Sequence, residues 1–150
     1  MFTEKSLLSK QRVGGRGSYR QYDADWKNIC YNPGKPATKN YKGPRPFSEP
    51  EAQAMRNFTL AHNFQMAISS HSSEEIIYWH FHQLGERKKR DYSLASMLAK
   101  KTGYSLVKPK KNPSGGYTDW FISGFKKPGF TLEVSKYVYR FKLSFRHITS

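Results

Sequence analysis

The feature that most constrains the fold is an alternation, from residue 48 onward, of helix-like segments with short apolar runs of the kind found in buried strands. Predicted helices cover residues 48–64, 91–103 and 119–124. Predicted strands cover residues 66–69, 76–79, 104–107, 129–134 and 139–146. Strands that alternate with helices are typical of α/β proteins, so we expect a mixed sheet with helices on its faces.

The first predicted helix has a clear start signal. Ser48 and Glu51 match an S-x-x-E capping box, in which each side chain can satisfy a backbone N–H at the helix start. Apolar residues at helical spacing then give this helix one apolar face: Ala54, Met55, Phe58 and Ala61. Asp91 is the predicted cap of the second helix and Gly103 its end. The first 47 residues, rich in Gly, Pro, Asn, Tyr and Lys, are predicted to be irregular.

Charge is the unusual part of the composition. The 150 residues contain 26 Lys and Arg against 11 Asp and Glu, which gives a net charge of +15. Such an excess attracts polyanions, among them nucleic acid and anionic cell-wall polymers. The basic runs lie between the apolar segments, which is also typical of a solvated surface, and no nucleic-acid-binding motif accompanies them. We therefore do not expect nucleic acid as a specific partner, and any binding of it would rest on charge alone.

Several classes of protein are excluded by pattern alone. No apolar run approaches the roughly eighteen residues that a membrane span requires. The N-terminus lacks the apolar stretch of a secretory signal, so we expect a cytoplasmic protein. The single cysteine, Cys30, excludes an internal disulfide and a cysteine-based zinc cluster.

Two chemically capable residues fall where ligands bind in sheets of this kind, outside the carboxyl ends of the strands. His71 follows one predicted strand, and Glu133 lies near the end of another. A histidine and a carboxylate that meet at one sheet edge can serve as metal ligand and base. The alternative is an isolated surface histidine and an ordinary glutamate at a strand end.

The residues around these two positions form more specific phrases. Four of them occur along the chain in this order: 48–51 (SEPE), 70–73 (SHSS), 114–120 (SGGYTDW) and 130–133 (FTLE). In this order they resemble the zinc carboxypeptidase family, over about residues 15–138. Three phrases look most like one bacterial branch: 32–37 (NPGKPA), 75–79 (EIIYW) and 116–122 (GYTDWFI). That branch comprises γ-D-glutamyl-L-diamino-acid peptidases, which cut peptidoglycan stem peptides.

The resemblance implies roles for four residues. His71 matches the last zinc ligand, and Glu133 matches the general base and acid that moves a proton from the zinc-bound water to the leaving amine. Arg20 lies where the family clamps the substrate carboxylate, a task that suits a planar guanidinium. Tyr117 is either a hydroxyl donor to the substrate or an aromatic that packs its loop. The implied cofactor is zinc, which lowers the pKa of its water to about 7, and the implied partner is a cell-wall peptide.

The sequence also departs from the family pattern. The first two zinc ligands of the family come from an H-x-x-E motif well upstream of the Arg20 position, but no histidine precedes His62. The literal H-x-x-E at residues 71–74 does not replace it, because Glu133 would then precede the last ligand, contrary to the family order. A catalytic zinc site needs three protein ligands, so we expect little or no peptidase activity from this chain alone.

The resemblance divides the chain into three parts. Residues 1–14 form a tail without a match, residues 15–138 the C-terminal half of a zinc carboxypeptidase-like domain, and residues 139–150 a divergent segment. The leading interpretation is a hydrolase of the zinc metallopeptidase type, acting on cell-wall peptides, with an incomplete metal site. The alternative is a non-catalytic basic module that holds an anionic polymer through residues such as Lys108, Lys110 and Lys111.

Overall fold

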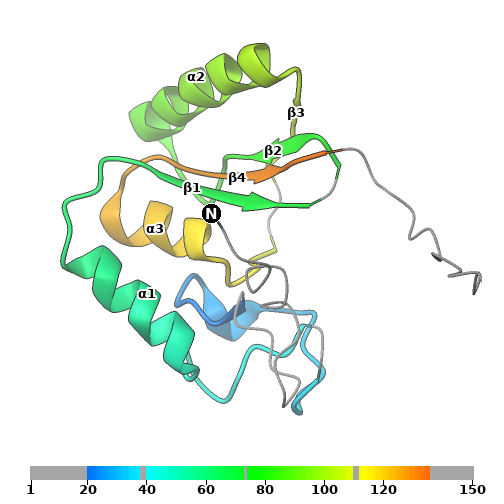
Figure 1. Cartoon of the computed structure of the whole chain (residues 1–150), viewed down its shortest axis with the longest axis vertical. Coiled ribbons are helices and arrows are strands. Elements are labelled where there is room, and N and C mark those ends of the chain that lie inside the picture. Colours follow the sequence, from blue (N-terminus) through cyan, green and yellow to red (C-terminus); the bar gives the residue numbers. More distant parts are fainter. Residues whose placement is uncertain (1–19, 38–39, 73, 110–111, 136–150) are drawn as a thin grey trace, which may run out of the picture.

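A computed structural model describes residues 20–37, 40–72, 74–109 and 112–135 of the chain. Within these ranges a four-stranded sheet lies between helix α2 on one face and helices α1 and α3 on the other (Figure 1). The strands are β1 (Ala67–His71), β2 (Ile76–Tyr78), β3 (Ser105–Leu106) and β4 (Gly129–Glu133). The helices are α1 (Pro50–Leu60), α2 (Gly85–Thr102) and α3 (Tyr117–Phe125), preceded by the short 3-10 helix η4 (Trp26–Asn28).

The sheet is mixed, and its strand order is β1-β4-β2-β3. Strand β4 runs parallel to β1 and antiparallel to β2, and β2 runs parallel to β3. This arrangement confirms the predicted α/β fold with a mixed sheet and helices on its faces. The predicted strand at residues 139–146 and the predicted terminal segments 1–14 and 139–150 lie outside the described residues. No helix in the described ranges is long and apolar enough to cross a membrane.

Two apolar clusters hold the layers together. One lies between the sheet and α2 and contains the buried residues Ile77, Trp79, Ala95 and Phe130. The other joins α1 and α3 to the segments that precede them and contains Tyr22, Ala24, Phe47, Ala52, Phe81, Trp120 and Ile122. Burial of aromatic side chains of this size is a main source of stability in a chain of this length.

Helix α1 begins without the predicted capping box. Its N-cap residue is Glu49, which makes no side-chain hydrogen bond to the first turn. Ser48 Oγ donates instead to Oε1 of the fully buried Gln21, at 2.6 Å. Pro50 occupies the first turn, where its missing N–H has no helical partner in any case. The prediction of a capping box was wrong because a tertiary hydrogen bond took the serine hydroxyl.

The predicted apolar face of α1 is exposed to solvent. Met55 and Phe58 are 45% and 53% exposed, whereas the buried residues of the helix are Ala52 and Thr59. An apolar stripe on a helix normally faces a core. Here the stripe faces away from the second apolar cluster, which α1 contacts through Ala52.

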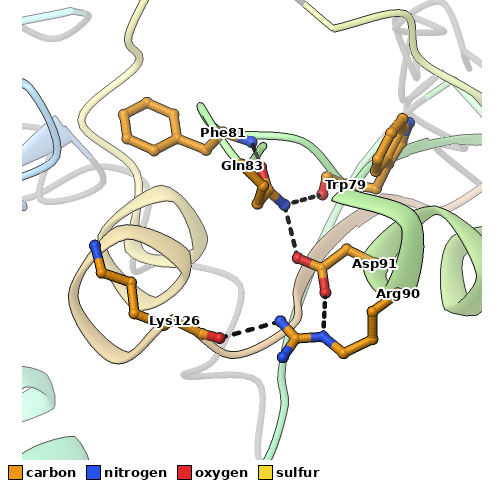
Figure 2. A network of polar contacts seen from close by, with 6 residues as sticks. All are labelled: Trp79, Phe81, Gln83, Arg90, Asp91 and Lys126. Carbon is orange, nitrogen blue, oxygen red and sulfur yellow. Dashed lines mark hydrogen bonds and ion pairs between the residues drawn. The ribbon is translucent and has the colours of Figure 1, made fainter. Parts of the chain in front are cut away.

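Helix α2 begins at Gly85 rather than at Asp91, so the predicted cap at Asp91 was wrong. Asp91 is fully buried inside the helix, where Oδ2 accepts a hydrogen bond from Gln83 Nε2 at 2.8 Å (Figure 2). Oδ1 accepts a second one from Arg90 Nε, also at 2.8 Å. The helix ends as predicted, at Gly103, which takes the left-handed conformation with φ of 78° that suits glycine.

Candidate functional site

His71 and Glu133 are the last residues of β1 and β4 and are direct partners in the parallel register. Neighbouring strands lie about 4.8 Å apart, and register partners point to the same face of a sheet. The imidazole and the carboxylate therefore emerge side by side on the face that carries α3. Beyond them the backbone pairing continues, since Val134 N–H donates to His71 O at 2.8 Å. The two residues that the sequence placed at one sheet edge are thus neighbours in the structure.

Helix α3 is fixed beneath these two strands by close contacts. Thr118 Oγ1 and Thr131 Oγ1 form a hydrogen bond of 2.7 Å between the helix and β4. At Gly129 an added Cβ would lie 2.9 Å from Ile122 Cγ1, so only a glycine lets the helix approach this closely. Thr131 lies two residues before Glu133 on the same face of β4, so α3 braces the strand that carries the carboxylate.

A hollow of about 470 Å³ adjoins His71, between α1 and β1. Its polar lining consists of Tyr22, Ser69, Ser70, His71 and Tyr117. Its apolar lining consists of Met55, Phe58, Phe64, Met66, Ala67 and Ile68. Arg20 and Glu133 are not among the lining residues. The structure therefore brings His71 together with Tyr117 in one recess, while Arg20 lies elsewhere.

Tyr117 opens α3 and packs against a second tyrosine. Its hydroxyl lies 3.0 Å from Thr59 Oγ1, and its ring is 5.4 Å from the ring of Tyr22 in an edge-to-face contact. Burial, reinforced by the neighbouring Tyr117, raises the pKa of Tyr22 to about 12. The Tyr117 hydroxyl and ring thus both have partners inside the protein. Sequence reasoning missed Tyr22, whose only signal was that it closes the short phrase Arg20-Gln21-Tyr22.

Arg20 lies against the glycine-rich loop before α3. Its Nη1 donates to Ser114 O at 3.3 Å, and the N–H of Tyr22 donates to Gly115 O at 3.1 Å. Gly115 has φ of +70°, and an added Cβ would lie 2.6 Å from Ile29 Cδ1 and 2.9 Å from Arg20 O. Glycine is required at this position by both the backbone conformation and the lack of space.

Asp119 supports the same loop from the first turn of α3. Ser114 Oγ donates to Asp119 Oδ2 at 2.7 Å and also accepts from Gly116 N–H at 3.3 Å. Burial raises the pKa of Asp119, and the hydrogen bonds from Ser114 oppose that rise. Sequence reasoning gave Asp119 no role, although an acid in the first turn of a helix is a common stabilising feature.

The described residues supply one ligand of the kind zinc prefers rather than a complete set. In the parts of the chain that the structure describes, no three His, Cys, Asp or Glu side chains gather closely enough to hold a metal ion. His71 offers an imidazole nitrogen, and a catalytic zinc site takes three protein ligands. Two further histidines, His80 and His82, follow β2, and they belong to no such group of three. The described donor set therefore does not fit zinc by itself.

Comparison with known proteins links this geometry to one family. The chain matches the zinc carboxypeptidase family over residues 8–149. It is 31% identical over 126 residues to the γ-D-glutamyl-L-diamino acid endopeptidase 1 of Lysinibacillus sphaericus. This alignment covers 83% of this chain and 31% of that protein. It is 25% identical over 130 residues to the uncharacterized protein YqgT of Bacillus subtilis, covering 85% of this chain and 34% of that protein. The chain thus spans about a third of the length of these curated relatives.

Solved structures share the fold. The carboxypeptidase A from Helicoverpa armigera superposes with a TM-score of 0.67 at 16% identity, over 81% of this chain and 33% of that chain. The murein-tripeptide amidase MpaA from Escherichia coli O157 superposes with a TM-score of 0.57 at 19% identity, over 85% of this chain and 52% of that chain. With the family match over residues 8–149 and the shared fold, this chain belongs to the zinc carboxypeptidase family.

Proposed function

We propose that the chain provides one part of a zinc peptidase that hydrolyses the γ-D-glutamyl-diamino acid bond of peptidoglycan stem peptides. In this role His71 is one zinc ligand, and Glu133 is the carboxylate that takes a proton from the attacking water and passes it to the leaving amine. The substrate class follows from the relative in Lysinibacillus sphaericus, whose name states this specificity. The observation that carries the proposal is the parallel register that pairs His71 with Glu133 at the ends of β1 and β4.

The proposal assigns substrate binding to Arg20 and Tyr117. A guanidinium binds a carboxylate through two parallel hydrogen bonds, and stem peptides carry carboxylates. The contact of Arg20 Nη1 with Ser114 O holds the side chain on the loop that leads into α3, the helix beneath Glu133. Tyr117 supports the same role through its place in the lining of the hollow beside His71.

This chain alone is expected to have little or no peptidase activity. The reason is the ligand count, since the H-x-x-E phrase of the family has no counterpart before His62. The chain is then the C-terminal half of the domain, with residues 15–138 as the matching part. That division stays a prediction.

A chimera tests the chemistry separately from the ligand count. Residues 15–138 of this chain replace the matching stretch of the Lysinibacillus sphaericus endopeptidase, whose remainder completes the domain. We expect the chimera to release the diamino acid from a γ-D-glutamyl-diamino acid peptide. Because general acid–base catalysis contributes about 10²–10⁴-fold, Glu133→Gln should lower kcat at least a hundredfold, and His71→Ala should remove zinc as well as activity. The matched control is Glu51→Gln, an exposed carboxylate on α1.

Three results would contradict the proposal. A folded chimera with bound zinc and no activity would refute the substrate assignment. Activity that survives Glu133→Gln would refute the role of that carboxylate. Release of diamino acid by the unmodified chain alone, lost on His71→Ala, would show that the chain already holds a full ligand set and is not incomplete.

A further inference from the structure

The solvent side of helix α2 is strongly basic. Six of the 18 residues of the helix are Lys or Arg, against two acids, and one of these acids, Asp91, is buried. Lys88, Lys89, Lys100 and Lys101 are all exposed, and we call them the α2 basic face. In the part of the chain that the structure describes, the ammonium groups of Lys88, Lys100 and Lys101 have no hydrogen bond or ion pair. These charges are therefore available to a partner.

The α2 basic face extends along the helix. Lys89 and Lys100 are eleven residues apart, which corresponds to about three turns and about 16 Å, so both lie on the same side of α2. Ser93 lies one turn after Lys89 on this side and is exposed. The one ion pair of the face, between Lys89 and Glu86, joins side chains that are 76% and 86% exposed, and such a pair is weak. The face thus has a cationic cluster at each end and a polar strip between them.

The cations at the start of the helix do not serve its stability. Arg87 and Lys88 lie in the first turn of α2, where the helix dipole favours acids and disfavours cations. Lys100 and Lys101 lie in the last turn, where cations are favourable. An anion that lies along the whole face offsets the unfavourable charges at the start of the helix.

We propose that the α2 basic face binds a linear phosphodiester polymer of the bacterial cell wall. Such a polymer carries one negative charge per repeat, so successive phosphates reach the cationic clusters at both ends of α2 at once. The exposed hydroxyl of Ser93 can donate a hydrogen bond to a phosphate oxygen between them. The choice of a cell-wall polymer rests on the proposed function, whose substrate is a cell-wall peptide, whereas the position of the binding face does not.

Two other polyanions fit the α2 basic face less well. A basic helix that binds a lipid surface buries its apolar side in the membrane. The apolar side of α2, with Ala95 and Leu98, instead packs against the sheet in the first apolar cluster. Nucleic acid is disfavoured because no nucleic-acid-binding motif accompanies the basic runs of the sequence.

The α2 basic face leads toward the candidate site. Ile76 pairs with both Glu133 of β4 and Ser105 of β3, so β3 begins at the sheet edge where β4 ends. Helix α2 ends at Thr102, shortly before β3, and its Lys100 end therefore lies toward the edge that carries Glu133 (Figure 1). A polymer that follows α2 would hold this edge of the sheet close to the cell wall.

The experiment uses the whole chain and a defined probe. The probe is poly(glycerol phosphate) of uniform length with a fluorescent label at one end, and its anisotropy during titration with the chain gives the dissociation constant. We expect binding that weakens steeply with salt, because each phosphate contact with a flexible polymer contributes about 0.7 to the slope of log affinity against log salt concentration. Single-stranded DNA with the same number of phosphates and vesicles that contain phosphatidylglycerol are the comparison ligands, and both should bind more weakly.

Matched variants separate the α2 basic face from the effect of net charge. The double variant Lys89→Gln with Lys100→Gln should raise the dissociation constant about tenfold and lower the salt slope by about 1.4. The control is Lys27→Gln with Lys35→Gln, which removes the same charge from two exposed lysines outside α2 and should raise the dissociation constant less than about twofold. Glu86→Gln removes the acid that pairs with Lys89 and should tighten binding. Far-UV circular dichroism checks that each variant is folded.

Any of four results would overturn the inference. These are no binding of the polymer by the wild-type chain, equal weakening by the two double variants, tighter binding of the DNA than of the polymer, or tighter binding of the vesicles than of the polymer. Polymer binding by the chain, combined with a folded and zinc-loaded chimera that is inactive, would support the inference and contradict the proposed function. An active chimera combined with no polymer binding would contradict the inference alone.

Discussion

Asp91 carries a buried carboxylate, and among the side chains of α2 its removal should lower the free energy of unfolding most. It accepts hydrogen bonds from Gln83 Nε2 and Arg90 Nε, each at 2.8 Å (Figure 2). A hydrogen bond to a charged group contributes about 1.5–3 kcal/mol. The Gln83 bond is buried and counts in full, whereas the side chain of Arg90 is 42% exposed, so water replaces part of its bond. We therefore expect Asp91→Ala to lower the free energy of unfolding by about 3 kcal/mol.

At this chain length, a loss of about 3 kcal/mol corresponds to a fall in Tm of roughly 6–12 °C. Urea and thermal unfolding, followed by far-UV circular dichroism, measure both quantities on wild type and variant. The matched control is Glu86→Ala, which removes a carboxylate from the same helix. The ion pair of Glu86 with Lys89 is exposed, so this variant should lower the free energy of unfolding by less than about 1 kcal/mol. If Asp91→Ala and Glu86→Ala unfold at the same urea concentration, the buried network does not anchor α2 and the reasoning is refuted.

Three further predictions use the same unfolding measurements or a titration. Gly34→Ala should lower the free energy of unfolding by about 1 kcal/mol, because Gly34 has φ of +72° and open space around it. Gly115→Ala should lower it clearly more, because the new Cβ would also lie 2.6 Å from Ile29 Cδ1. Equal losses in the two variants would contradict the crowding argument. Burial raises the pKa of Asp119 above its ordinary value of 3.8. The stability that Asp119 contributes is therefore complete below pH 3.8 and is lost as the pH rises through the raised pKa. Asp119→Asn should flatten this decline in the urea midpoint with pH. Tyrosine absorbance should show one group that ionises at about pH 12 and is missing in Tyr22→Phe; an unchanged titration would contradict the burial argument.

Local sequence signals located the elements better than they located the helix starts. Ser48 and Asp91 both match capping rules, and both have other partners in the structure. The hydroxyl of Ser48 bonds to Gln21, which is 27 residues away, and the carboxylate of Asp91 bonds to Gln83 across a buried contact. A capping rule weighs only neighbours within one turn, so it cannot detect a tertiary acceptor or donor that competes for the same side chain.

The candidate site was predictable only in part for a related reason. Order along the chain placed His71 and Glu133 at strand ends, but their adjacency depends on β4 lying between β1 and β2. A strand order of this kind is not sequential, and periodicity does not encode it. The contact between Arg20 and Ser114, 94 residues apart, is equally invisible to local patterns, and only the resemblance to a family pointed to Arg20.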